Sequence, residues 1–180
     1  LDLLSDSSLA ELCTPIVFGD AEVLVRCAEQ TGKSSDFTEI GRNNLESATE
    51  PCVLDLGLMN TNQFKPGAIS PACGRATFGY VTEAIEACLS GQIDAVTTCP
   101  ANKEALQSAG VPHPGHTEIF AEQTQTGKFC MAFLSDKINC SLVTVHAGYE
   151  QVPGLLNERR IAEVIELTRE THKKLLGTEP

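Results

Sequence analysis

The residues best suited to chemistry include those of a short segment after Pro114. In Gly115-His116-Thr117-Glu118 an imidazole and a hydroxyl stand side by side, after a glycine that permits a tight turn and at the expected start of a helix. An imidazole at a helix N-terminus can donate to an anionic ligand or move a proton. Taken alone, such a histidine is more often structural than catalytic.

A second polar segment, Thr97 to Lys103, follows an expected strand over 93–98. Its hydroxyls, the amide of Asn102 and the ammonium group of Lys103 form a set suited to holding a phosphate or carboxylate. An equally weighted structural interpretation is that Asn102 caps the next helix while Lys103 lies in solvent.

The other histidines carry weaker signals. His146 comes thirty residues after His116, at the end of an expected strand over 138–145. Imidazole is a common ligand of catalytic metals, but such a site usually needs three protein donors. His113, which lies between two prolines, is interpreted as a loop residue near the site, and His172 as solvent-facing on a charge-rich helix.

The elements that must position these residues alternate between strands and helices. This order is typical of an α/β fold with a mixed, mostly parallel sheet in a three-layer α/β/α arrangement, in which ligands collect at the carboxyl ends of strands. A separate pair of strands after residue 127 is expected to form an antiparallel hairpin. The patterns predict strands over 15–20, 51–56, 93–98, 128–134 and 138–145, and helices over 1–12, 21–30, 70–89, 102–109, 117–125 and 156–176.

Bulk composition narrows the class of partner. The 180 residues carry a net charge of -11, which disfavours nucleic acid and anionic membranes and favours a small-molecule ligand. No two of the eight cysteines form a C-x-x-C pair, so we expect buried thiols in a reducing compartment. The chain shows no apolar run long enough to span a bilayer and no basic n-region, which predicts a cytoplasmic enzyme. Residues 1–180 are interpreted as an incomplete amino-terminal portion, cut at both ends.

Together these segments resemble one enzyme family. The run Asp94 to Lys103, then Gly110, then Gly115 to Glu118, then Thr144-Val145-His146 is similar in order and spacing to 4-hydroxythreonine-4-phosphate dehydrogenases of pyridoxine biosynthesis. The resemblance also takes in residues 15–20 and 67–76. It implies a fold similar to isocitrate and isopropylmalate dehydrogenases, and the sequence agrees in having no G-x-G-x-x-G fingerprint after a strand.

The resemblance implies the chemistry as well. Family members oxidise 4-phosphooxy-threonine (4-hydroxythreonine 4-phosphate) with NAD, or with NADP, and need a divalent metal such as Zn, Co, Mg or Ni; the β-keto acid product then loses carbon dioxide. His116 and Thr117 match positions that bind substrate in the family. Asn102 and Lys103, whose side chains suit a phosphate, are further candidates for substrate binding. His146 matches the first of three metal-binding histidines, and the other two lie outside this chain. Catalytic residues and cofactor contacts stay unassigned.

Family members form homodimers with a shared active site, and the fragment alone is expected to be inactive. Alternatives remain open: the same chemistry on threonate or erythronate 4-phosphate, or on an aromatic dihydrodiol acid. Acyl transfer from coenzyme A to phosphate, known on a related fold, is more remote. A rival of another class is a non-catalytic binding module that kept the fold.

Overall fold

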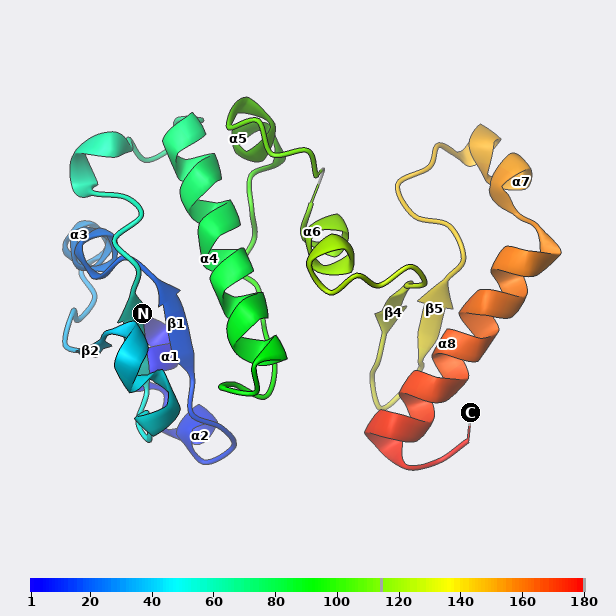
Figure 1. The fold of residues 1–180 in the computed structure, drawn as a ribbon, viewed down its shortest axis with the longest axis horizontal. Coiled ribbons are helices and arrows are strands. Elements are labelled where there is room, and N and C mark those ends of the chain that lie inside the picture. Colours follow the sequence, from blue (N-terminus) through cyan, green and yellow to red (C-terminus); the bar gives the residue numbers. More distant parts are fainter. Residues whose placement is uncertain (114, 180) are drawn as a thin grey trace. The chain divides into compact units, whose positions relative to one another are not determined.

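The computed structural model describes residues 1–113 and 115–179, so the predicted turn residue Pro114 and the terminal Pro180 lie outside the described residues. The chain divides into two compact units, Leu1–Thr124 and Gln125–Pro180, each described by itself. Figure 1 shows the helices and strands of both units.

The first unit is built on a three-stranded parallel sheet. Its strands are β1 (Ile16–Gly19), β2 (Thr38–Ile40) and β3 (Cys52–Asp55), in the order β1-β3-β2. The central strand is the most buried, because both of its edges are paired and its apolar side chains enter the core. The prediction of a parallel α/β sheet is confirmed, with β2 as a strand that the pattern missed.

The helices of this unit follow their capping signals. Helix α3 (Ala21–Thr31) ends at Gly32, whose left-handed backbone, φ 66°, suits a residue without a side chain. Helix α4 (Pro71–Leu89) begins after Ser70, whose hydroxyl accepts a hydrogen bond from the Ala72 N–H. Both helices are confirmed, and Ala87 of α4 packs with Leu45 and Leu54 in the core of the sheet.

The amino-terminal segment forms two helical turns in place of the single helix predicted over 1–12. These are α1 (Asp2–Ser5) and α2 (Ser7–Ala10). The break has a local cause: the Asp6 carboxylate accepts from the N–H groups of Ser8 and Leu9 and so starts a new helix. Two segments of 3₁₀-helix follow, η1 (Arg42–Ser47) and η2 (Thr61–Gln63).

Helices α5 (Lys103–Ser108) and α6 (His116–Gln123) complete the first unit and pack against α4. The contact with α5 is very close at Gly74, where a Cβ atom would lie 2.0 Å from the carbonyl oxygen of Ala105. The predicted strand over 93–98 is wrong: this mostly exposed segment pairs with no strand in the described part of the chain. A strand needs a ladder partner to satisfy its backbone groups, whatever its side-chain pattern.

The second unit is a hairpin packed on a long helix. Strands β4 (Met131–Phe133) and β5 (Cys140–Leu142) pair antiparallel, as predicted, and are followed by η3 (Tyr149–Gln151), α7 (Val152–Leu155) and α8 (Glu158–Leu176). The Asn157 side chain caps α8, the last of the predicted helices, by accepting from the Arg160 N–H. The Arg160 guanidinium joins hairpin to helix by donating to the carbonyls of Val143, at 3.2 Å, and Phe129, at 3.0 Å.

The eight cysteines are free thiols, but the prediction that they are buried holds fully only for Cys52. Cys13, Cys99 and Cys140 are exposed, because the first two lie outside regular elements and the third lies in a two-stranded sheet with little cover. Among the described residues, no helix is both long and apolar enough to cross a membrane.

Candidate functional site

A buried carboxylate organises the carboxyl edge of the parallel sheet. Asp20, the first residue after β1, is only 3% exposed. It accepts hydrogen bonds from the backbone N–H groups of Leu58, at 2.9 Å, and Met59, at 2.5 Å, and from the Tyr80 hydroxyl, at 2.6 Å. These donors belong to the loop after β3 and to α4, so one side chain fixes three segments at the edge where ligands collect.

The surroundings of Tyr80 change its acidity. Burial, followed by the hydrogen bond to Asp20 and the negative charge of that carboxylate, raises the pKa of the Tyr80 hydroxyl far above its ordinary value. Tyr80 is therefore a hydrogen-bond donor throughout the physiological range. Sequence reasoning missed this pair. The available signal was an aspartate at the end of the segment predicted as a strand over 15–20.

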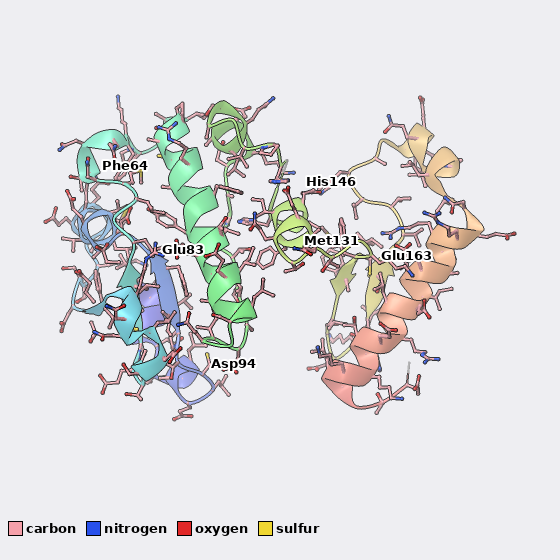
Figure 2. All side chains as sticks on the ribbon, viewed as in Figure 1. Phe64, Glu83, Asp94, Met131, His146 and Glu163 are labelled. Atoms are coloured by element: carbon pink, nitrogen blue, oxygen red, sulfur yellow. The ribbon has the colours of Figure 1, made fainter. Side chains whose placement is uncertain are left out.

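The loop over 57–69 is fixed to α3 as well. The Thr61 hydroxyl donates to Glu22, at 2.6 Å, and the Thr61 carbonyl accepts from Arg26. The Arg26 guanidinium also lies 4.7 Å from the ring centroid of Phe64, a residue that Figure 2 labels. A cation over an aromatic face is attractive in addition to the apolar contact. This long loop is thus an anchored part of the sheet edge.

Asn102 and Lys103 lie where the helix-cap interpretation put them. The Asn102 side-chain oxygen accepts from the Ala105 N–H at 2.8 Å, and Lys103, the first residue of α5, is exposed. Lys103 nevertheless reaches toward the other polar segment. A Cβ atom on Gly115 would lie 3.9 Å from the Lys103 Cε and 3.5 Å from a Glu118 carboxylate oxygen. The structure therefore brings Lys103 and the predicted turn together.

His116 and Thr117 occupy the first turn of α6 and are half-buried. The helix is fixed by Ile119, which is 0% exposed and packs with Val81 and Ile85 of α4. The Lys103 side chain, a Glu118 carboxylate oxygen and the first N–H groups of α6 thus lie around Gly115, and His116 and Thr117 follow it directly in the chain. The ammonium group and the N–H groups can hold an anion against the repulsion of the Glu118 carboxylate, and an imidazole beside them can keep a proton close to it.

The two histidines without an assigned role are both engaged. His113 stacks on Phe78 of α4, with ring centroids 6.3 Å apart, and its Nε2 contacts the Glu122 carboxylate of α6. The ring of His172 lies 3.0 Å, at Nδ1, from the Thr178 carbonyl oxygen beyond the end of α8. His172 is half-buried, because its ring contacts the backbone that follows α8. This corrects the prediction that it faces solvent.

His146 lies in the second unit, on the segment after β5 (Figure 2). It is exposed, and its φ of 55° is in the left-handed region, which few residues other than glycine adopt. Across residues 1–113 and 115–179, no group of three or more His, Cys, Asp or Glu side chains could hold a metal ion. One imidazole does not make a metal site, so these residues alone do not fit the metal that the family resemblance implies.

A groove of about 870 Å³ runs along α8 in the second unit. It is lined by charges of both signs, among them Lys128, Arg159, Glu163 and Arg169, with Glu163 labelled in Figure 2. None of the predicted site residues lines it. The groove therefore adds nothing to the candidate site at the sheet edge.

Comparison with known proteins gives matches over nearly the whole chain. Residues 11–180 match the family model described as pyridoxal phosphate biosynthetic protein PdxA. A protein of Oceanobacillus iheyensis whose inferred activity, by its name, is D-threonate 4-phosphate dehydrogenase is 37% identical over 93% of this chain and 51% of its own length. A 4-hydroxythreonine-4-phosphate dehydrogenase of Desulfosudis oleivorans is 31% identical over 98% of this chain and 53% of its own.

Solved structures agree with these relatives. The crystal structure of 4-hydroxythreonine-4-phosphate dehydrogenase from Klebsiella pneumoniae is similar with a TM-score of 0.79 at 28% identity, over 89% of this chain and 49% of that one. The enzyme of the same name from Burkholderia phymatum gives a TM-score of 0.79 at 30% identity, over 94% and 52%. The chain thus spans about half the length of the proteins it matches.

Proposed function

The chain belongs to the PdxA family of pyridoxal phosphate biosynthetic proteins, and on that premise we propose that the full-length protein is a dehydrogenase that oxidises 4-hydroxythreonine 4-phosphate. Relatives that carry this name, in sequence and in structure, support the substrate. The observation that carries the proposal is the convergence of Lys103 with the His116–Thr117 turn around Gly115.

Charge explains why this convergence matters. A phosphorylated acid approaches a chain with a net charge of -11, so the overall field opposes binding. Local groups must overcome that field. The Lys103 ammonium, the hydroxyl of Thr117 and the first N–H groups of α6 can bind the anionic end of the substrate, while His116 can donate to it or hold a proton beside it.

The cofactors belong to the same proposal. NAD, or NADP, would accept the hydride, and His146 would be one of several ligands to a divalent metal such as Zn, Co, Mg or Ni. Such an ion would supply Lewis-acid stabilisation of the substrate alkoxide, and the β-keto acid product would lose carbon dioxide. The other ligands would have to come from outside the described residues, in keeping with a homodimer that shares its active site.

The test is an assay of NADH formation by the full-length protein with 4-hydroxythreonine 4-phosphate and with the same compound lacking the phosphate. Lys103→Gln should raise KM for the phosphorylated substrate roughly ten- to hundredfold, since a hydrogen bond to a charged group contributes about 1.5–3 kcal/mol. Lys137→Gln, an exposed lysine in the hairpin turn, is the matched control. Equal KM values for the two variants would remove Lys103 from the site.

A second substrate is favoured by one observation. The relative inferred to act on D-threonate 4-phosphate is 37% identical, against 31% for the hydroxythreonine enzyme of Desulfosudis oleivorans. The same assay with threonate and erythronate 4-phosphates, and with an aromatic dihydrodiol acid, separates these substrates. Turnover of none of them, with either nicotinamide cofactor and with added metal, would refute the dehydrogenase proposal and leave a non-catalytic binding module.

The proposed homodimer and the proposed metal are tested by separate measurements. Light scattering coupled to size exclusion gives the oligomeric state of the full-length protein. Removal of the metal with a chelator should abolish NADH formation, and titration of Zn, Co, Mg or Ni should restore it. Replacement of His146 by alanine should weaken metal binding, measured directly as bound ion per protomer, because one imidazole ligand is lost.

A further inference from the structure

His113 is held on both sides although it lies in a connecting segment. Its side chain is only 14% exposed, in the link between α5 and α6. The ring lies on Phe78 with an interplanar angle of 20° and a centroid distance of 6.3 Å. Stacking at this separation is attractive beyond the area it buries. A histidine that merely crossed a loop would show no such contact.

The surface under His113 belongs to the core. Phe78 packs against the buried cluster of Val81, Ile85 and Ile119, which joins α4 to α6. Close packing makes such a cluster resistant to small displacements. The His113 ring is therefore held against a fixed surface.

The second contact of His113 reaches the helix that carries the predicted substrate-binding pair. Its Nε2 contacts the carboxylate of Glu122, on α6, whose side chain is 60% exposed. A contact with so exposed a carboxylate contributes little to stability, so the stacking contact is the stronger of the two. Both contacts nevertheless hold His113 against the same pair of helices, α4 and α6.

His113 also lies close to the predicted turn along the chain. One residue separates it from Gly115, and His116 directly follows Gly115. Consecutive Cα atoms are about 3.8 Å apart, so a shift of His113 must be absorbed within two peptide bonds or passed on to the turn. We infer that His113 is a positioning residue, which fixes the entry to the His116–Thr117 turn through its stack on Phe78 without touching the ligand.

Only the kinetic consequence of this inference, the change in KM, rests on the proposed function. In the full-length protein, His113→Ala should raise KM for the phosphorylated substrate about tenfold and speed amide hydrogen exchange over residues 115–119. His113→Phe keeps an aromatic ring on Phe78 and should stay within about threefold of wild type in KM. Glu122→Gln removes only the charge of the exposed partner and should stay within about twofold.

His172→Ala is the control, because it removes a half-buried histidine that belongs to the second unit. The inference is overturned if His113→Ala leaves both KM and exchange over 115–119 within twofold of wild type. It is also overturned if exchange accelerates equally throughout α4 and α5, since that result means general destabilisation. If the wild type oxidises none of the substrates, the proposed function fails, and exchange over 115–119 still decides whether His113 positions the turn.

Discussion

Replacing Tyr80 by phenylalanine should destabilise the first unit through a single lost hydrogen bond. The Tyr80 hydroxyl donates to the buried Asp20 carboxylate at 2.6 Å, and Asp20 keeps only the N–H groups of Leu58 and Met59 once the hydroxyl is gone. A hydrogen bond to a charged group contributes about 1.5–3 kcal/mol. We therefore expect the free energy of unfolding to fall by about 2 kcal/mol at neutral pH.

The raised pKa of Tyr80 also predicts how the free energy of unfolding changes with pH. The pKa of Tyr80 is raised in the folded protein, so the folded state holds the phenol proton more tightly than the unfolded state does. This contribution is fully present below the ordinary tyrosine pKa of about 10 and is lost as pH rises above it, by up to about 1.4 kcal/mol for each pH unit. Wild type should thus lose stability above pH 10 more steeply than Tyr80→Phe.

The measurement is urea denaturation followed by far-ultraviolet circular dichroism at several pH values from 7 to 11. Tyr149→Phe is the matched control, because Tyr149 is 94% exposed and its replacement should leave the free energy of unfolding unchanged. Tyr80→Phe with the stability of wild type at pH 7 and the same slope above pH 10 would refute the assignment of Tyr80 as the essential donor to Asp20.

Three further predictions concern other parts of the chain. The buried thiol of Cys52, whose pKa is raised by burial, should react with a thiol reagent at least about a hundredfold more slowly than exposed Cys99, measured by mass spectrometry of labelled peptides; equal rates would contradict the burial. Asn102→Ala should cost about 1 kcal/mol by removing the cap of α5, measured by urea denaturation, whereas Asn102→Asp should restore it. Arg160→Met should speed amide exchange in the hairpin, because two carbonyls lose their donor, and unchanged exchange would show that the packing of α8 suffices.

Helices were predictable where local chemistry sets their ends. Ser70 and Asn157 cap α4 and α8, and Gly32 ends α3, so side-chain type and backbone preference alone located these boundaries. The split of the first helix was equally local, since the Asp6 carboxylate is the cause, but the apolar spacing concealed it. Such signals act over a few residues and can be recognised without tertiary structure.

Strands were harder, because pairing decides them. The short strand β2 contains a charged residue, Glu39, and carries no alternating pattern, yet it forms because the central strand β3 offers an edge. The segment over 93–98 has a good strand pattern but no partner in the described part of the chain. Side-chain pattern describes which faces can be buried, whereas ladder hydrogen bonds depend on what lies alongside.

The site was predictable in part for the same reason. The order of motifs selected Lys103, His116 and Thr117, and the structure confirms that Lys103 and the turn lie together. Their substrate-binding roles, with that of Asn102, stay predictions, as does the metal role of His146. The Asp20–Tyr80 pair could not be found, because sixty residues separate its members and only the fold brings them into contact.

Gly74 is a position of the first unit that tolerates almost no substitution. Because the backbone of α5 occupies the space that a Cβ atom would need, every substitution must separate α4 from α5. A scan of all substitutions should return glycine alone at this position, while Gly127, with nothing within 4 Å of its Cβ position and no positive φ, should accept most residues. Two glycines that look alike in the sequence therefore differ in how much variation they permit.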